Sequence, residues 1–188
     1  MNIHPEKAMQ SLTDLTPFPI EKVETFFLSE PHIQLMAGEK SFREFFEFFK
    51  SEYSFSKSYQ NFLQIWEDII GEPKSGMEAL VRSLSRSYKV ILCSNTDPEH
   101  WRVCRNKCGF IKTYFLNCFL SYEMGLVKPS STIYERMLSE LSINPSDAVF
   151  IDDSNENINA AAKVGLKTIH ATSFEAITAS LKNLDINY

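Results

Sequence analysis

The pattern of hydrophobic and polar positions changes character once along the chain. Over residues 19–70 apolar residues, many of them aromatic, recur at helical spacing. Ser41 followed by Glu44 is typical of a capping box that opens a helix, and residues 56–70 carry the pattern of another helix. We therefore predict an all-helical subdomain over residues 1–73. An aromatic stripe at this spacing usually forms core, although it could also line a substrate pocket.

The second part of the chain follows a connection at residues 71–76. Short apolar runs here alternate with amphipathic helical patterns, which indicates a parallel sheet covered by helices on both faces. We predict a doubly wound α/β core over residues 74–188. The expected strands are residues 89–93, 117–121, 148–151 and 167–170, and the expected helices are residues 97–108, 131–141, 156–164 and 174–184.

Polar residues follow the first expected strand, where the chain reads Ser94, Asn95, Thr96 and Asp97. In such sheets ligands bind beyond the carboxyl ends of the strands. A hydroxyl and free backbone N–H groups at the start of a helix favour an anion, and phosphate suits this position. The alternative is that Asp97 is an ordinary helix N-cap, and both interpretations can hold together.

Two further strand or loop ends carry charged residues. Asp152 and Asp153 end the third expected strand, and adjacent carboxylates repel each other unless a cation neutralises them. Mg²⁺ is the natural partner because it accepts one or two carboxylates, water and a substrate phosphate. The alternative is that one Asp caps the next helix and the other is solvated. Lys128, which precedes Pro129, is either a solvated loop residue or a point charge for phosphate.

This ordered set of residues resembles the haloacid dehalogenase-like hydrolase superfamily, and especially its sugar-phosphate phosphatase branch with a helical cap. The resemblance covers essentially the whole chain. Three of the family's four motifs have counterparts in the segments 92–96, 125–129 and 150–153. The pattern of residues 121–125 before Lys128 and Pro129 is also similar to that branch.

The resemblance implies an activity and a set of site residues. It implies a Mg²⁺-dependent phosphatase that acts on a small phosphorylated metabolite through an aspartyl-phosphate, with the cap selecting the substrate. Lys128 would steady the nucleophile and the phosphate charge, and Asp152 and Asp153 would hold Mg²⁺ or its water. The residues expected to hold the phosphoryl group are Ser94, Asn95, Thr96 and Lys128.

The family's first motif, a central strand ending in Asp-x-Asp, has no counterpart in the chain. Asp14 is the one early candidate, and we reject it because residues 8–13 do not form a buried strand pattern. A start upstream of Met1, a strand lent by another chain, or a degenerate relative would each explain the gap. We expect the chain as given to be inactive and prone to self-association through the unfilled sheet.

Composition and charge narrow the functional classes. The formal net charge is −5 with dispersed Lys and Arg, which argues against nucleic acid as a partner. No apolar run approaches the length of a membrane span, so we expect a cytoplasmic protein. We expect the cysteines to be small hydrophobic residues of the core. A metal site built on Cys104 and Cys108 is the less favoured alternative.

Two rival functions remain open. A non-catalytic protein that binds phosphate and metal as a regulator or partner would keep the same pocket without the nucleophile. Carbon–halogen hydrolysis occurs in the same superfamily, but it would leave Asp152 and Asp153 without a purpose as Mg²⁺ ligands.

Overall fold

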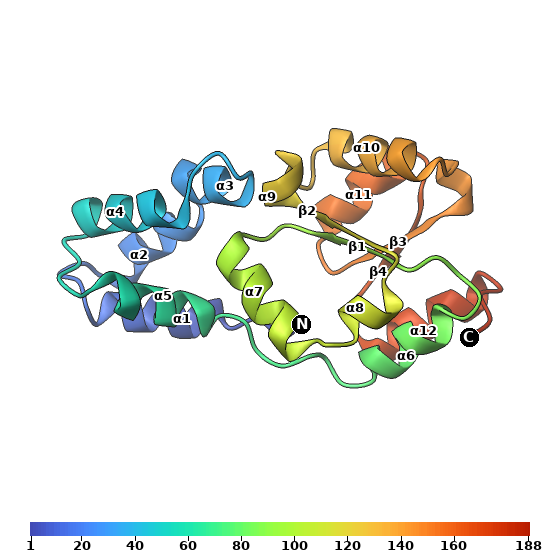
Figure 1. The fold of residues 1–188 in the computed structure, drawn as a ribbon, viewed down its shortest axis with the longest axis horizontal. Coiled ribbons are helices and arrows are strands. Elements are labelled where there is room, and N and C mark those ends of the chain that lie inside the picture. Colours follow the sequence, from blue (N-terminus) through green and yellow to red (C-terminus); the bar gives the residue numbers. More distant parts are fainter. The chain divides into compact units, whose positions relative to one another are not determined.

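The computed structural model describes residues 1–188 (Figure 1). The chain forms two compact units, each described here by itself. The helical unit comprises Met1–Lys74, Cys93–Thr113 and Leu120–Gly125. The strand unit comprises Ser75–Leu92, Tyr114–Phe119 and Leu126–Tyr188. The predicted division into a helical subdomain over residues 1–73 and a core over residues 74–188 stays a prediction.

Helices make up almost all of the helical unit. They are α1 (Pro5–Thr13), α2 (Ile20–Phe27), α3 (Glu30–Met36), α4 (Phe42–Glu52), α5 (Tyr59–Glu67), α7 (Pro98–Lys107) and the short α9 (Ser121–Met124). The predicted capping box is confirmed, because the Ser41 side chain accepts from the Glu44 N–H and the Glu44 side chain accepts from the Ser41 N–H. A second capping box, between Ser58 and Asn61, opens α5.

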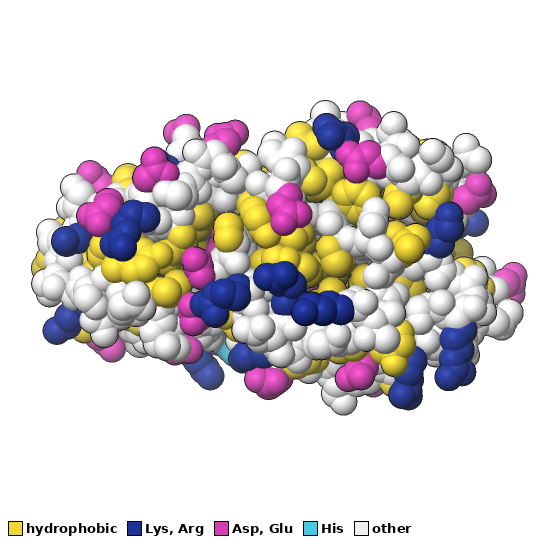
Figure 2. All heavy atoms as spheres, viewed as in Figure 1, with side chains coloured by type: hydrophobic (Ala, Val, Ile, Leu, Met, Phe, Trp, Pro, Cys, Tyr) yellow, Lys and Arg dark blue, Asp and Glu magenta, His cyan; other side chains and the backbone are white.

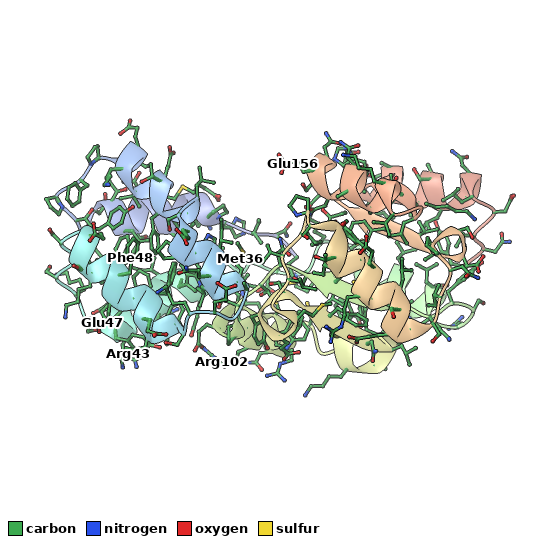
Figure 3. All side chains as sticks on the ribbon, turned by 90° about the horizontal axis from the view of Figure 1, so that it is seen from above. Met36, Arg43, Glu47, Phe48, Arg102 and Glu156 are labelled. Atoms are coloured by element: carbon green, nitrogen blue, oxygen red, sulfur yellow. The ribbon has the colours of Figure 1, made fainter.

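Aromatic side chains form the core of the helical unit, as their spacing predicts. The ring of Phe26 lies 4.6 Å from those of both Phe45 and Phe49. The opposite side of α4 faces solvent, where Arg43 and Glu47 project outwards (Figure 3). On the face shown in Figure 2, apolar side chains remain visible between α4 and α5 among interspersed acidic and basic ones.

The strand unit is built around a parallel strand pair. Strands β3 (Val149–Asp152) and β4 (Lys167–His170) pair in register, with Ile151 opposite Ile169 and Asp152 opposite His170. The helices of this unit are α6 (Met77–Leu84), α10 (Ser131–Leu141), α11 (Asn155–Lys163) and α12 (Phe174–Asn183), with a short 3-10 helix at Pro145–Asp147 and α8 (Ile111–Tyr114) at the border of the units.

Side chains of β3 alternate between two apolar layers, as the pleat of a strand requires. Val149 and Ile151 pack against a buried cluster that α6, β4 and α12 supply, with Ile169 in it. Phe150 points the other way, and its ring contacts that of Tyr134 in α10 at 5.1 Å. Helices therefore cover both faces of the pair, which is the predicted α/β arrangement with parallel strands.

The sheet differs from the single sheet that we expected. Strand β1 (Ile91–Ser94) pairs only with β2 (Asn117–Leu120), and β3 pairs only with β4, so there are two two-stranded sheets. All four residues of β1 are half-buried, whereas a strand inside a doubly wound sheet is buried on both faces. Each strand has one hydrogen-bonded neighbour, which explains its exposure. The missing central strand itself stays a prediction.

Helix α6 and the short α9 were not expected from the sequence. The end of the second expected strand, Ser121, instead begins α9. No helix in the chain combines the length and apolar character that crossing a membrane requires.

Candidate functional site

The end of β1 leads through Asn95 and Thr96 into helix α7, as the sequence predicts. Ser94 is the last residue of β1, and Asp97 is the N-cap of α7. The Asp97 carboxylate accepts hydrogen bonds from the backbone N–H groups of Glu99 at 2.9 Å and His100 at 3.0 Å. Asp97 therefore satisfies the start of α7 with its own negative charge.

Thr96 is buried, and its backbone is held by a single side chain. Its N–H donates to the Ser121 hydroxyl at 2.9 Å, and the same hydroxyl donates to the Thr96 carbonyl at 3.0 Å. Ser121 has no exposed surface. Both polar groups of the Thr96 backbone are thus satisfied within the protein.

These bonds correct one expectation from the sequence. We predicted free backbone N–H groups for an anion at the start of α7, and this is wrong for Thr96, Glu99 and His100, because Ser121 and Asp97 accept their hydrogen bonds. Pro98 has no N–H. The interpretation of Asp97 as a helix cap is confirmed, and the N–H groups of Thr96, Glu99 and His100 are already used within the protein.

A buried polar network surrounds Asp97 and links α7 to α5. Its Oδ2 accepts a hydrogen bond from Trp66 Nε1 at 3.1 Å and lies 2.9 Å from His100 Nδ1. His100 Nε2 lies 2.8 Å from the Trp66 carbonyl oxygen, and the two rings stack at 4.9 Å. Both partners of the His100 ring are acceptors, so only the doubly protonated ring donates to both.

Several contacts together determine the protonation of Asp97. Burial by itself raises the pKa of Asp97, but the positive charge of His100 and the hydrogen bonds from His100 and Trp66 outweigh that effect, and the net pKa lies below its ordinary value. Asp97 is therefore a buried carboxylate held in its ionised form. Contacts with His100 and Trp66 favour the charged form of Asp97, and the start of α7 fixes the position of its carboxylate.

Lys128 and Asp152 form a buried ion pair in the strand unit. Lys128 Nζ lies 2.6 Å from Asp152 Oδ2, and the two side chains are only 8% and 7% exposed. The other carboxylate oxygen, Oδ1, accepts from the Ser154 N–H and from the Asn157 side-chain amide, both at 2.9 Å. Lys128 also lies 5.6 Å from the centre of the Phe150 ring. Lys128 is therefore not a solvated loop residue, and it directly contacts one carboxylate of the acidic pair.

These contacts keep Asp152 ionised. Burial raises the pKa of its carboxyl group, whereas the hydrogen bond and charge of Lys128, together with the Ser154 and Asn157 donors, lower the pKa by more. The result is a pKa below the ordinary value. Asp152 therefore presents a charged, oriented carboxylate at the carboxyl end of β3.

Asp153 differs from its neighbour, because its side chain is exposed. Its carbonyl oxygen lies 3.1 Å from His170 Nε2. The two carboxylates supply the hard oxygen donors that Mg²⁺ prefers, and this ion needs only one or two of them beside water and substrate oxygens. Asp152 and Asp153 therefore fit this ion, although no group of three His, Cys, Asp or Glu side chains gathers here as an all-protein metal cage would require.

The structure also shows the surroundings of Asp14 and of the two cysteines considered in the sequence. Asp14 is exposed at the end of helix α1, where it accepts a hydrogen bond from Gln10, so it does not follow a buried strand. Cys108 is buried and its thiol contacts the sulfur of Met1. Burial is the main cause that raises the pKa of Cys104 to about 11, and no disulfide joins the cysteines.

The predicted site residues fall into two groups. Lys128, Asp152 and Asp153 belong to the strand unit, and the structure brings the first two into direct contact. The phosphate-binding candidates Ser94, Asn95 and Thr96 belong to the helical unit. Reasoning from the sequence assigned no role to Asn157, Ser121 or His100. The available signal for Ser121 was a small polar residue at the end of an apolar run.

Comparison with known proteins places these features in a family context. The chain is similar to a D-ribitol-5-phosphate phosphatase from Bacteroides thetaiotaomicron, with 29% identity over 111 residues, which are 56% of this chain and 53% of that protein. It is also similar to flavin mononucleotide hydrolase 1 from Arabidopsis thaliana, with 25% identity over 112 residues, which are 60% of this chain and 45% of that protein. The matches thus span about half the length of these relatives.

Solved structures share the fold. One is a HAD family enzyme from Bacteroides thetaiotaomicron in complex with magnesium and inorganic phosphate, with a TM-score of 0.83, 24% identity and coverage of 94% of this chain and 92% of that one. Another is a predicted HAD-like family hydrolase from Porphyromonas gingivalis, with a TM-score of 0.83 and 21% identity. The match covers 97% of this chain and 92% of that chain. The fold is therefore the HAD-like α/β fold with a helical cap. Because a family profile matches residues 5–165, the chain belongs to the haloacid dehalogenase-like hydrolases.

Proposed function

We propose that the chain carries the phosphate- and Mg²⁺-binding part of a phosphomonoester hydrolase for a small phosphorylated metabolite. The observation that carries this proposal is the buried Lys128–Asp152 pair at the carboxyl end of β3. Ligands bind at this end of parallel strands in α/β folds. Similarity to proteins named as a D-ribitol-5-phosphate phosphatase and a flavin mononucleotide hydrolase supports the substrate class.

In this proposal Lys128 supplies the positive charge for the phosphoryl group. Its ammonium group is almost fully buried, and a charge acts more strongly on a nearby anion where water is excluded. Asp152 Oδ2 holds this ammonium group in place, while Asp152 Oδ1 accepts hydrogen bonds from Ser154 and Asn157. Ser94, Asn95 and Thr96 would complete the phosphate contacts through their side chains.

Asp152 and Asp153 would hold Mg²⁺, which when bound offsets negative charge on the phosphate oxygens. Lys128 contacts Asp152 Oδ2, so a metal ion held by this carboxylate oxygen would compete with that contact. The ammonium group released from this contact would then be available to the phosphate. We therefore expect Mg²⁺ and phosphate to bind with positive cooperativity.

The complete reaction needs a nucleophile that the chain as given does not show. In the family this is the first Asp of the Asp-x-Asp motif, and none of the described carboxylates takes its place. We propose that the chain by itself binds phosphate without hydrolysing esters. The second candidate is a non-catalytic phosphate- and metal-binding protein, which would use the same Lys128–Asp152 pair.

Isothermal titration calorimetry tests the proposed site. Mg²⁺ should bind the parent chain more tightly in the presence of inorganic phosphate than in its absence. Asp152→Asn should weaken Mg²⁺ binding, and Lys128→Met should weaken phosphate binding. Asp185→Asn is the matched control, since Asp185 is exposed at a positive φ that Asn tolerates. Identical Mg²⁺ titrations for the parent and Asp152→Asn would show that the Lys128–Asp152 pair is only structural.

Reading the DNA upstream of Met1 separates the two candidates. An in-frame apolar strand that ends in Asp-x-Asp supports the hydrolase. A stop codon there supports the non-catalytic binder.

A further inference from the structure

Ser121 is unusual among the polar residues because its hydroxyl group satisfies both backbone groups of one distant residue. It accepts from the Thr96 N–H at 2.9 Å and donates to the Thr96 carbonyl oxygen at 3.0 Å, without any exposed surface. A serine hydroxyl has one donor and two acceptor sites, so this pair of bonds uses its donor and one acceptor. The contact joins the end of β2 to the loop that follows β1.

The Ser121 clamp acts directly on the proposed phosphate segment. The Thr96 N–H belongs to the peptide group that joins Asn95 to Thr96, so the hydrogen bond fixes the orientation of that peptide. The peptide in turn sets where the Asn95 side chain begins and where the chain leaves Ser94. On the other side, Asp97 anchors the segment by capping α7. Ser121 therefore holds the segment at Thr96, and Asp97 holds the chain directly after it.

The short helix that carries Ser121 is itself tightly placed. Gly38, in the turn between α3 and α4, has a φ of +72°, and a Cβ atom there would lie 2.1 Å from the carbonyl oxygen of Tyr122. The turn thus rests on the backbone next to Ser121, and only glycine allows this approach. Backbone packing on one side and the Thr96 bonds on the other leave Ser121 little freedom.

We propose that Ser121 is a positioning residue for the phosphate site, which fixes the Ser94–Asn95–Thr96 segment without touching the ligand. This inference rests on the proposed function and adds to it the residue that orders the segment. Loss of the hydroxyl should let the Asn95–Thr96 peptide rotate. A misdirected hydrogen bond to a charged ligand corresponds to roughly a tenfold weaker affinity.

The test is nuclear magnetic resonance of the full ¹⁵N-labelled chain, titrated with inorganic phosphate and, separately, with Mg²⁺. Phosphate should shift the amide signals of Ser94 to Thr96 in the parent. Ser121→Ala should bind phosphate about tenfold more weakly and exchange the Thr96 amide proton faster. Mg²⁺ titration of the Asp153 amide should stay unchanged, which a general loss of folding would not allow.

Two variants separate positioning from packing. Ser121→Cys keeps nearly the same side-chain volume with a much weaker hydrogen-bonding group, so it should behave like Ser121→Ala, and it replaces that variant if the alanine chain does not fold. Ser139→Ala, at an exposed serine of α10, is the matched control and should bind phosphate like the parent.

The outcomes distinguish this inference from the proposed function. Faster Thr96 exchange with unchanged phosphate affinity would overturn the role of Ser121 and leave the phosphate site intact. Parent-like phosphate binding by Ser121→Cys would also overturn it. A parent chain whose Ser94 to Thr96 signals ignore phosphate would overturn the proposed function, and this inference with it.

Discussion

Replacing Asp97 with alanine should destabilise the protein far more than the loss of an ordinary helix cap. Removal of an N-cap acceptor costs about 1 kcal/mol. Asp97 also compensates the buried His100 ring at 2.9 Å and accepts from Trp66 Nε1 at 3.1 Å. Breaking a buried pair by removing one partner costs about 3 to 5 kcal/mol. We expect a total loss of about 3 to 5 kcal/mol, because the two effects overlap, out of a net stability of roughly 5 to 15 kcal/mol.

Urea unfolding followed by circular dichroism measures this loss, provided that the slope of the transition stays constant between variants. The matched control is Ser173→Ala, which removes an exposed cap acceptor from the Ala176 N–H in α12 and no ion pair. It should cost about 1 kcal/mol. An equal loss in Asp97→Ala and Ser173→Ala would refute the reasoning, since the His100 and Trp66 contacts would then contribute nothing.

The pH dependence of Asp97 provides a second readout of the same network. Its folded pKa lies below the ordinary value of 3.8, so its ionised form stabilises the fold above that pH. This contribution is lost as the pH falls through the lowered folded pKa. The stability difference between the parent and Asp97→Asn should therefore shrink as the pH falls through the lowered pKa of Asp97. A difference that grows on acidification would contradict an ionised Asp97.

Further outcomes are expected of the two site groups and the sheet. Asp152→Ala should cost about 3 to 5 kcal/mol in urea unfolding, because it leaves the buried Lys128 ammonium group unpaired. The parent should release no phosphate from p-nitrophenyl phosphate with Mg²⁺, and release that survives Asp14→Ala would require an unidentified nucleophile. A peptide with the family's first strand should raise the melting temperature, and sedimentation should show self-association without it; an unchanged monomer in both assays would count against an unfilled sheet.

Local patterns predicted the elements whose cause is local. The bounds of β4 and α10 match the predicted ranges 167–170 and 131–141, and the Ser41 capping box follows from residues three apart. The proximity of Lys128 and Asp152 also followed from the sequence, because the carboxyl ends of strands are where such residues meet. In each case the spacing of residues along one element, or the position of a residue at the end of a strand, determines the structure.

Contacts between distant residues escaped prediction for an equally physical reason. Trp66 contacts Asp97 and His100 across 31 and 34 residues of chain, and no spacing rule relates Trp66 to either of them. The same holds for Ser121 and Thr96, which are 25 residues apart. The expectation of free N–H groups failed because a side chain with its own charge already occupied the helix start.

The register of β3 explains why its outer edge matters to the candidate site. Ala148 and Asp152 accept through their carbonyl oxygens from the N–H groups of Lys167 and Ala171 in and beside β4, so the backbone groups of these alternate residues face β4. The backbone groups of Val149 and Ile151 consequently face away from β4. Before Asp152 this strand has only apolar residues, without the charges or proline that protect natural edges. A strand added at this edge would extend the sheet next to Asp152, at the end of β3 where Asp152 contacts the buried ammonium group of Lys128. We therefore expect the peptide that carries the family's first strand to pair at this edge, beside the Lys128–Asp152 ion pair.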